Sequence, residues 1–375
     1  MKIAMLGHKR IPSREGGVEI VVEELASRMY AKGHDVTVYN RRGHHVSGKE
    51  NEAFQYDKKF DYKGIHVITI PTFENKSLNA IVYSFLATLH ALFQSYDVIH
   101  FHAEGPCAMI PIAKLFGKRC VATIHGLDWQ RSKWGGFATR FLLFGEKMAA
   151  KYANEVIVLS KNVQTYFKET YGRDTNYIPN GIDKQEKVLP QIITDKYGLQ
   201  GKDYYLFLAR IVPEKGLHYL IDAYEQIDTD KKLVIAGGSS HTDVYFEQIK
   251  EKCKENPDII MTGFVQGKEL AELFGNCYAY VLPSDVEGMP LSLLEAMSYG
   301  CNCLVSDIPE NLEVVKDKAF SFKKSDVQSL ADALAKMDSL NEEERIQKSI
   351  EIQQYAIQQF GWNDVVNSTL DLYLK

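Results

Sequence analysis

Short apolar runs alternate along this chain with longer stretches of helical periodicity. Lys2–Leu6 (KIAML) is followed by a helical pattern over 18–32, and the same alternation recurs along the sequence. Apolar runs bounded by turn residues predict buried strands, and their alternation with helices is typical of βαβ units and a parallel sheet. The other strands expected are Asp35–Tyr39, Ile65–Ile70, Asp97–Phe101, Cys120–Ile124, Glu155–Leu159, Tyr204–Leu208, Lys232–Ile235, Ile259–Met261, Ala279–Leu282 and Cys301–Val305.

The predicted strands form two series, separated by a polar stretch near Lys184–Asp203. A chain of 375 residues is long enough for two cores. We therefore expect an α/β protein with two doubly wound domains, 1–185 and 186–360. Ligands of such sheets bind outside the carboxyl ends of the strands, so the loops that follow the strands are where chemistry is expected.

The net charge of −5 is unevenly distributed. Residues 1–185 hold 25 Lys and Arg against 18 Asp and Glu, a net charge of +7, whereas residues 186–375 hold 19 against 31, a net charge of −12. Two domains with different partners would show this pattern, and so would ordinary drift between two solvated surfaces. The near-neutral total speaks against a nucleic-acid-binding protein.

Cysteine usage and the apolar segments bear on the compartment. The six cysteines form no C-x-x-C pair, which predicts reduced, buried thiols in a cytoplasmic protein. The apolar run at the N-terminus is too short for a signal peptide, and Leu78–Phe93 is too short and too interrupted to span a bilayer. A cytoplasmic location is therefore expected.

The first candidate loop, Gly7–Gly17, enters the first helix through Gly16 and Gly17. Paired glycines permit close backbone approach, and a helix N-terminus offers N–H groups to an anion. The loop also contains the positive residues His8, Lys9, Arg10 and Arg14. The pattern predicts an anion site, with a flexible surface loop as the alternative.

Histidines stand at the ends of two later strands. His125 is followed by a glycine and Asp128, which suits a base or a hydrogen-bond partner of a sugar hydroxyl, although a lone histidine is often structural. His100 and His102 share one strand face, but no third ligand has fitting spacing, so residues lining a site are favoured over zinc ligands. Trp129 is expected either to pack in the core or to stack on a sugar.

Cations follow the first strand of the second series. Arg210 lies directly after that strand, and Lys215 lies five residues later at a helix start. Such a pair can clamp a diphosphate, because Arg offers a planar fork and Lys a point charge. A surface loop is the alternative.

At another strand end, backbone groups of Gly263 and Phe264 are candidates to frame a nucleobase.

Two carboxylates flank a further helix start. Glu287 lies in the loop and Glu295 two turns into the helix, with Gly288 and Pro290 at the turn. The N–H groups over 289–292 would bind phosphate, while the carboxylates would accept hydrogen bonds from sugar hydroxyls. The same spacing also suits a solvated helix.

The motifs in their order carry a resemblance. A Gly-Gly loop, His-Gly-x-Asp at 125–128, Pro-Asn-Gly-Ile-Asp at 179–183, Arg-x₄-Lys-Gly at 210–216 and Glu-x₇-Glu at 287–295 resemble the retaining glycosyltransferases of family 4. These have the GT-B fold: two Rossmann-like domains facing a cleft, with a C-terminal helix, here 361–375, crossing back to the first. The resemblance implies that the first domain binds the acceptor and the second the nucleotide-sugar, and that the enzyme needs no metal or cofactor.

Roles carried over from the family fall on matching positions. Arg210 and Lys215 would hold the donor diphosphate, Glu295 would contact the ribose and Glu287 the transferred sugar. His125 would lie beside the sugar, and retention would proceed by same-face attack. The remaining donor-binding residues implied are Gly16, Gly17, Gly263, Phe264, Gly288, Met289, Pro290 and Leu291. The acceptor-binding residues expected are Lys9, Arg14, His102 and Asp128.

A narrower resemblance concerns two stretches, GHKRIPSREGGVEIVVEELA and HGLDWQRSKWGGFATRFLLFGE. They resemble bacterial transferases of capsule or cell-wall polysaccharide, including rhamnosyltransferases. The first stretch departs from the Arg-Gly-Ile-Pro and Tyr-Gly-Gly-Phe of that subgroup, so both a UDP-hexose and dTDP-rhamnose stay open as donor.

The partners expected are a glycan or polyprenyl-diphosphate-linked acceptor and an anionic membrane surface at the basic half, with no nucleic acid. The other functions considered are a nucleotide-sugar 2-epimerase of the same fold and a non-catalytic nucleotide-sugar-binding subunit.

Overall fold

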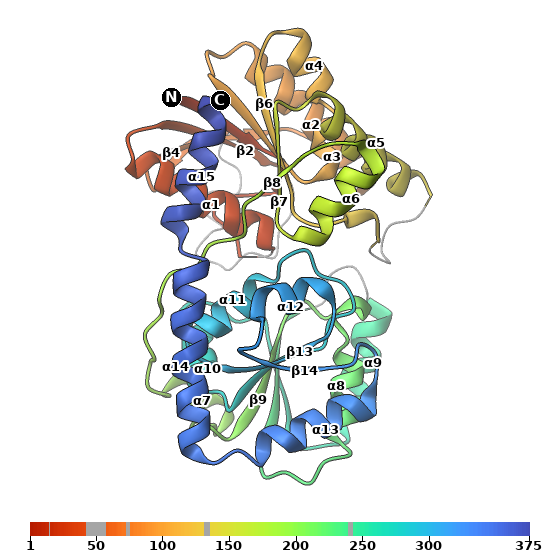
Figure 1. Cartoon of the computed structure of the whole chain (residues 1–375), viewed down its shortest axis with the longest axis vertical. Coiled ribbons are helices and arrows are strands. Elements are labelled where there is room, and N and C mark those ends of the chain that lie inside the picture. Colours follow the sequence, from red (N-terminus) through yellow and green to blue (C-terminus); the bar gives the residue numbers. More distant parts are fainter. Residues whose placement is uncertain (15, 43–57, 73–75, 131–135, 239–242) are drawn as a thin grey trace. The chain divides into compact units, whose positions relative to one another are not determined.

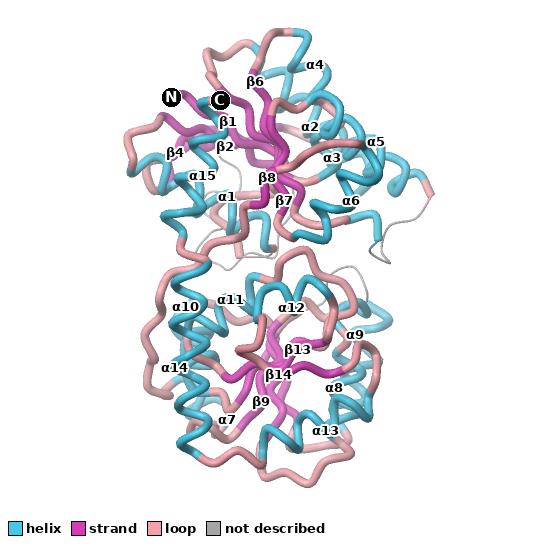
Figure 2. The backbone as a smooth tube through the Cα atoms, in the orientation of Figure 1, coloured by secondary structure: helices cyan, strands magenta, loops and turns pink. Residues whose placement is uncertain are grey.

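The computed structural model describes residues 1–14, 16–42, 58–72, 76–130, 136–238 and 243–375. The chain divides into two compact units. Unit 1 comprises Met1–Gly181 together with Trp362–Lys375, and unit 2 comprises Ile182–Gly361. In each unit a twisted sheet lies between helices on its two faces (Figures 1 and 2). Both units are thus Rossmann-like α/β structures, as the alternating pattern predicts.

The sheet of unit 1 has the strand order β3-β4-β2-β1-β5-β6-β7-β8. All neighbours are parallel except β3 and β4, which pair antiparallel. The strands are β1 (Lys2–Leu6), β2 (Asp35–Arg41), β3 (Lys59–Tyr62), β4 (Ile65–Ile70), β5 (Val98–His102), β6 (Arg119–Ile124), β7 (Glu155–Val158) and β8 (Asn176–Tyr177). The edge strands β3 and β8 were not expected from the sequence.

The helices of unit 1 are α1 (Gly17–Ala31), α2 (Lys76–Leu92), α3 (Glu104–Cys107), α4 (Ile110–Leu115), η2 (Asp128–Gln130), α5 (Phe137–Tyr152), α6 (Lys161–Tyr171) and α15 (Trp362–Leu374). The last of these comes from the end of the chain and lies beside α1 (Figure 1). Two hydrogen bonds fasten it to the sheet: Arg119 Nη2 donates to the Leu372 carbonyl at 2.7 Å, and the Tyr373 hydroxyl meets His100 Nδ1 at 2.6 Å.

Unit 2 has a six-stranded, all-parallel sheet of order β11-β10-β9-β12-β13-β14. Its strands are β9 (Tyr204–Leu208), β10 (Lys232–Ala236), β11 (Ile259–Gly263), β12 (Ala279–Leu282), β13 (Asn302–Ser306) and β14 (Phe320–Phe322). Its helices are α7 (Ile192–Tyr197), η3 (Pro213–Lys215), α8 (Leu217–Tyr224), α9 (Asp243–Lys254), α10 (Gly267–Asn276), α11 (Leu291–Ser298), α12 (Pro309–Val315), α13 (Val327–Asp338) and α14 (Glu342–Gln359). Only β14 was not expected among these strands.

Each unit has its own core, and its central strands supply most of it. In β1 and β9 the residues Ile3–Leu6 and Tyr204–Phe207 have no exposed surface. Burial of one such large apolar side chain stabilises the fold by about 1.5–3 kcal/mol, which is why continuous apolar runs form the centre of each sheet. All six cysteines are buried and unpaired, as predicted.

Candidate functional site

The loops at the carboxyl edge of the unit 2 sheet are joined by backbone hydrogen bonds. The Ile211 N–H donates to the Gly238 carbonyl at 3.0 Å, linking the loops after β9 and β10. The Gly237 N–H donates to the Gly263 carbonyl at 2.9 Å, linking the loop after β10 to the end of β11. Residues that follow three separate strands therefore lie along one edge, as the parallel topology requires.

The loop after β9 also meets the loop after β12. The Asp285 N–H donates to the Glu214 carbonyl at 2.9 Å. Gly216 has a φ of +67°, and a Cβ built there would lie 2.0 Å from the Pro283 carbonyl oxygen. A side chain at position 216 would therefore push the two loops apart, and the glycine permits their close approach.

This approach brings the predicted cation and carboxylate together. Lys215 Nζ forms an ion pair with Glu287 Oε1, although the two residues are 72 positions apart. Their side chains are only 14% and 8% exposed. Arg210, half-buried, belongs to the same loop as Lys215. The arrangement supplies cations for a diphosphate and a carboxylate for a hydroxyl, the donor chemistry that the motifs predict.

Helix α11 starts directly after Gly288, Met289 and Pro290, and Leu291 is its first residue. Its first N–H groups have no partner within the helix, which suits an anion. Sequence reasoning missed Tyr280 on β12, whose hydroxyl donates to Ser292 Oγ at 2.8 Å in the first turn. Burial raises the pKa of Tyr280, and the nearby carboxylates of Glu287 and Glu295 raise it further, so this phenol remains a neutral donor.

Gly263 and Phe264, the residues expected beside a nucleobase, lie at the end of β11, two strands away from β9. Both are exposed, with 43% of the Phe264 surface accessible. Their role toward a base stays a prediction.

In unit 1, the loop Gly7–Gly17 is held by Asn40 at the end of β2. Asn40 Oδ1 accepts the Ile11 N–H at 2.9 Å, and its Nδ2 donates to the Ile11 carbonyl at 2.8 Å. His8 Nε2 lies 3.1 Å from the same Oδ1. Burial lowers the pKa of His8 to about 4, so this ring is neutral and adds no positive charge, contrary to the sequence-based expectation.

Glu19 lies at the start of α1. One of its carboxylate oxygens accepts the Lys9 N–H at 2.8 Å, and a Cβ on Gly16 would lie 2.5 Å from the other. A carboxylate is favourable at this end of a helix because of the helix dipole. The helix start at Gly16 and Gly17, predicted to bind an external anion, thus has an internal carboxylate beside it.

Arg14 of this loop lies near a carboxylate as well. Arg14 Nη2 lies 3.5 Å from Glu23 Oε1, and Lys63 Nζ lies 2.8 Å from the same atom. The Lys9 side chain is exposed.

Three histidines lie in a row near the carboxyl ends of β5 and β6, with their neighbouring rings tilted by 33–34°. The His100 and His102 ring centroids are 4.1 Å apart, and His102 Nδ1 lies 3.1 Å from His125 Nε2. Burial lowers the pKa of His100 to about 3, and that of His102 falls well below its ordinary value for the same reason. Neither these histidines nor any other described set of three or more His, Cys, Asp or Glu side chains is placed to hold a metal ion.

His102 was expected to contact the acceptor, but its side chain has no exposed surface. Its Nδ1 lies against Nε2 of the half-buried His125, so His102 contacts that ring and not solvent.

Beyond His125 the chain turns through η2. The Asp128 N–H donates to Glu104 Oε1 at 3.2 Å, and Trp129 Nε1 donates to Glu146 Oε2 at 3.2 Å. The Trp129 ring also packs against Tyr166 at 6.3 Å between centroids, so it is a packing residue. Asp128 is half-buried. The neighbouring positive and aromatic positions 131–134 of this motif lie outside the described residues.

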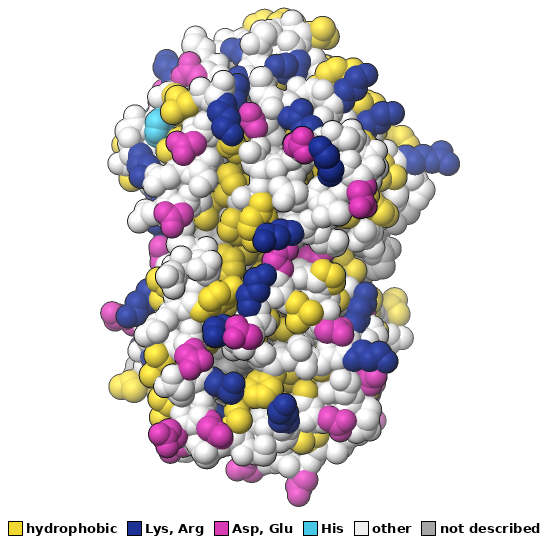
Figure 3. All heavy atoms as spheres, in the orientation of Figure 1, with side chains coloured by type: hydrophobic (Ala, Val, Ile, Leu, Met, Phe, Trp, Pro, Cys, Tyr) yellow, Lys and Arg dark blue, Asp and Glu magenta, His cyan; other side chains and the backbone are white. Residues whose placement is uncertain are grey.

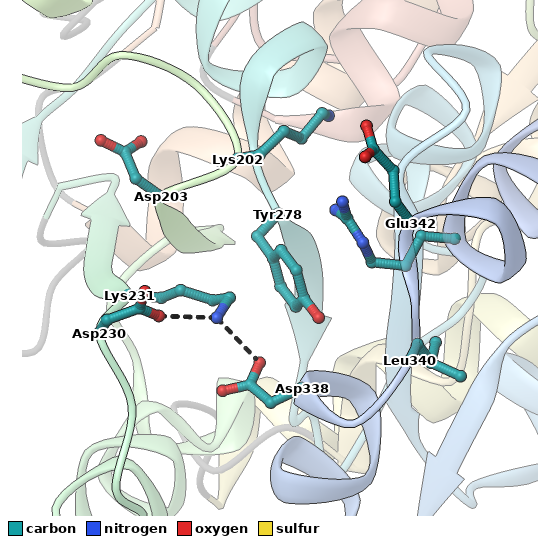
Figure 4. Close-up of a pocket in the computed structure, with 9 residues that line it drawn as sticks. Lys202, Asp203, Asp230, Lys231, Tyr278, Asp338, Leu340 and Glu342 are labelled. Carbon is teal, nitrogen blue, oxygen red and sulfur yellow. Dashed lines mark hydrogen bonds and ion pairs between the residues drawn. The ribbon is translucent and has the colours of Figure 1, made fainter.

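A pocket of about 310 Å³ occurs in unit 2 away from these loops (Figure 4). Its lining includes Lys202, Asp203 and Lys231, which precede or begin β9 and β10, so it lies at the amino ends of the strands. Lys231 Nζ forms ion pairs there with Asp230 at 2.8 Å and with Asp338 at 3.6 Å. This pocket is separate from the candidate site, which lies at the carboxyl ends.

Comparisons with known proteins cover both units. Residues 15–186 match the family model for glycosyltransferase family 4, and residues 191–354 match the model for glycosyl transferases group 1.

Two curated relatives and one solved structure are similar to the chain. The UDP-Gal:alpha-D-GlcNAc-diphosphoundecaprenol alpha-1,3-galactosyltransferase of Escherichia coli is 29% identical over 65% of this chain and 67% of that protein. The GDP-mannose-dependent alpha-(1-6)-phosphatidylinositol monomannoside mannosyltransferase of Mycolicibacterium smegmatis is 24% identical over 77% and 76%. The fold matches the crystal structure of Anabaena HepE (Alr3699) with UDP and glucose, with a TM-score of 0.80, 18% identity, and coverage of 99% and 98%.

Proposed function

Because this chain belongs to the superfamily of GT-B glycosyltransferases built from family 4 and group 1 domains, we propose that it is a retaining, metal-independent hexosyltransferase. Its donor is a nucleotide-diphosphate sugar, for which a UDP-hexose is favoured over dTDP-rhamnose. Its acceptor is a glycan linked to a polyprenyl diphosphate during the synthesis of a cell-surface polysaccharide.

The observation that carries this proposal is the Lys215–Glu287 ion pair at the carboxyl edge of unit 2. Sugar transfer from a nucleotide needs charge stabilisation at the departing diphosphate. Lys215, Arg210 and the N-terminus of α11 supply it from side chains and backbone dipoles, a role that a metal ion fills in other enzymes. Glu287 orients Lys215 and accepts a hydrogen bond from the transferred sugar.

The acceptor is assigned to unit 1, where His125 projects from the end of β6. In a same-face reaction the acceptor oxygen bonds to the anomeric carbon as the bond from that carbon to the diphosphate breaks. The proton of the acceptor hydroxyl passes to the departing phosphate oxygen, so no covalent enzyme intermediate forms. His125 positions the reacting sugar by hydrogen bonding.

The choice of substrate rests on the relatives. The Escherichia coli relative uses UDP-Gal and a diphosphoundecaprenol-linked acceptor, and the Anabaena structure contains UDP. The uridine nucleotide common to both names favours a UDP-hexose here, and the lipid diphosphate in the name of the Escherichia coli relative favours a polyprenyl-linked glycan.

We further assign an anionic membrane as a partner of unit 1. No described helix is both long enough and apolar enough to cross a bilayer. Phe93, Leu115 and Phe116 are 76%, 85% and 59% exposed. Lys118 Nζ donates to the Gln94 carbonyl at 2.8 Å, which links the chain segments at the ends of α2 and α4 that carry these side chains. This apolar tip, with its adjacent lysines, suits a surface of anionic lipids.

Liposome flotation tests the membrane assignment. The chain is expected to bind anionic vesicles at low salt and to detach as salt rises, and a Phe93→Ser/Phe116→Ser variant is expected to bind less. Absence of binding at low salt would refute it.

The donor is identified by thermal-shift measurements with UDP, dTDP, GDP and ADP, because a ligand that binds only the folded state raises the melting temperature. UDP is expected to give the largest shift. Transfer from a UDP-hexose to a polyprenyl-diphosphate glycan is then followed by mass spectrometry, with the anomeric configuration of the product determined by NMR. Retained configuration and activity in EDTA are expected. An inverted product, or activity lost in EDTA and restored by Mg²⁺, would refute the proposed mechanism.

The 2-epimerase alternative is tested with UDP-N-acetylglucosamine alone. Epimerised sugar formed without any acceptor would replace the transferase proposal.

A further inference from the structure

Two buried carboxyl groups lie next to each other and contact the loop that carries His125 and Asp128. Glu104 begins α3 directly after β5, and Glu146 lies in α5. Neither has any exposed surface. Gly145 makes room for this contact between helices, since a Cβ there would lie 2.0 Å from the Glu104 carbonyl oxygen.

Glu146 is surrounded by donors. Its Oε1 accepts from the Tyr166 hydroxyl at 2.8 Å and from the Tyr171 hydroxyl at 2.5 Å, and its Oε2 accepts from Trp129 Nε1 at 3.2 Å. Three neutral donors converging on one carboxyl group are what a buried carboxylate requires. Both oxygens of Glu146 are therefore supplied with hydrogen-bond donors.

Glu104 has a different environment. Its Oε1 accepts the Asp128 N–H, but its buried Oε2 finds no donor among the described residues. A negative charge on this buried oxygen without a hydrogen-bond donor would destabilise the fold. If the oxygen carries a proton, it becomes a donor, and the hydrogen bond between the Glu104 and Glu146 side chains is then complete.

We propose that Glu104 is a neutral carboxylic acid whose proton is shared with Glu146, and that this pair positions the loop carrying His125 and Asp128. The proton sits on Glu104 Oε2 and is donated to Glu146. Through Glu104 the pair holds the Asp128 backbone, and through Glu146 it holds the Trp129 indole. Both are positioning residues, and their functional role rests on the proposed function.

The electrostatic surroundings agree with this geometry. Burial raises the pKa of Glu104 to about 10, with Asp128 on η2 and Glu146 on α5 adding to the effect. The other titratable groups near the pair are Cys107 on α3 and, across Glu146, Tyr166 and Tyr171 on α6. For each of these three, burial is the main cause of a raised pKa, so all are neutral near pH 7.

The decisive experiment compares wild type with Glu104→Gln, since an amide keeps both the donor and the acceptor of the neutral acid. Folding of the wild type takes up a proton at Glu104 between the unfolded pKa near 4.5 and the folded value near 10. Its stability should therefore fall with rising pH across this window, and the variant lacks this contribution. The unfolding constant of wild type relative to Glu104→Gln is expected to rise about tenfold per pH unit between pH 6 and 9.

Glu169→Gln on α6, an exposed position, is the matched control and should keep the wild-type pH dependence. A protonated carboxyl band in the infrared spectrum at pH 7, lost in Glu104→Gln, is also expected. Parallel stability curves for Glu104→Gln and wild type, or no such band, would overturn the shared proton, whether or not the protein transfers a sugar.

The positioning role has its own readout. Glu104→Gln is expected to keep kcat/KM for the acceptor within about twofold, whereas Glu104→Leu and Glu146→Gln should each lose at least about tenfold, with UDP affinity unchanged. If Glu104→Gln lost as much as Glu104→Leu, the neutral acid would not be the positioning form. A wild-type chain without any transferase activity would refute the proposed function and leave the pH comparison as the test of the proton.

Discussion

Buried ionisable side chains near the carboxyl edges of the two sheets differ in their charge state. In unit 1, burial makes three of these side chains neutral near pH 7. It lowers the pKa values of His8 and His100 to about 4 and 3, and it raises the pKa of Glu104 to about 10. In unit 2, pairing retains charge, because Lys215 and Glu287 form an ion pair in a shielded loop. Desolvation favours neutral forms, and a close counter-charge favours ionised ones.

This contrast runs against the overall charges. The half with a net charge of +7 holds the buried, uncharged His8, His100 and Glu104 near its strand ends, and the half with −12 holds the cationic donor loop. On the face shown in Figure 3, the Lys and Arg side chains of each unit are spread among Asp and Glu. The local arrangement at strand ends, and not the sum over a domain, thus decides which unit suits an anionic diphosphate.

The largest effect is expected from Lys215→Met, which breaks the ion pair in unit 2. It leaves Glu287 without its partner in a site that is only 8% exposed. We expect the free energy of unfolding to fall by about 3 kcal/mol and the rate of sugar transfer to fall at least about 100-fold. Denaturant titration and initial rates measure the two effects.

A double variant and a control separate stability from chemistry. Lys215→Met/Glu287→Leu should recover stability, because no charge remains unpaired, but not activity. Lys231→Met removes a lysine that pairs with Asp338 at the opposite edge of unit 2 and should leave transfer intact. Wild-type transfer rates in Lys215→Met would contradict the proposed donor loop.

A second variant, His125→Ala, tests whether the carboxyl edge of unit 1 takes part in the reaction. We expect kcat to fall about 100-fold, because the ring that orients the reacting sugar is lost, while UDP affinity stays at the wild-type value. Calorimetry with UDP and steady-state kinetics distinguish the two. His66→Ala, on β4 with a side chain 55% exposed, serves as the control. A loss of UDP affinity in His125→Ala equal to the loss of rate would place that residue in the donor site instead.

A third test compares two glycines of unit 2. Gly216 and Gly198 have nearly equal φ angles of +67° and +68°, but only Gly216 has a close neighbour, the Pro283 carbonyl. At Gly198 no described atom lies within 4 Å of a built Cβ. Alanine at 198 should cost about 1 kcal/mol of backbone strain, and alanine at 216 about 3 kcal/mol because the loops must separate. Equal losses in chemical denaturation would show that the loop contact contributes nothing.

The last test concerns a pH dependence in unit 1. The folded pKa of His100 lies below the unfolded value of 6.5, so the unfolded chain binds a proton that the folded chain excludes. Stability is therefore lost as the pH falls from 6.5 toward 3. A His100→Gln variant should show a slope smaller by about 1.4 kcal/mol per pH unit between pH 6 and 5. An unchanged slope, measured by denaturant titration at each pH, would mean that His100 is protonated in the folded state.

The strands whose bounds the sequence patterns predict best are paired on both sides within a sheet. Lys2–Leu6, Ile65–Ile70, Tyr204–Leu208 and Ala279–Leu282 have the expected bounds. The strands that were missed are short edge strands, β3, β8 and β14. An edge strand pairs on one side and needs few apolar residues, so its pairing is decided by distant backbone groups rather than by its own pattern.

The site shows the same division. Motif order pointed to Arg210, Lys215, Glu287 and His125, but the Lys215–Glu287 contact spans 72 positions and had no local signal. Asn40, Tyr280 and the Glu104–Glu146 pair were missed. A possible signal for Glu146 was its position at the end of the apolar run FLLFGE, where a carboxylate needs a buried partner.

The α/β architecture follows from the sequence alone, because the period of apolar residues dictates which segments become strands and helices. The sequence also determines which residue types stand at the strand ends, because parallel strands place their following loops at one edge. Which of those residues are charged depends on how the chain folds. Ionisation depends on burial and on counter-charges brought from distant segments, and neither is encoded in the neighbouring sequence.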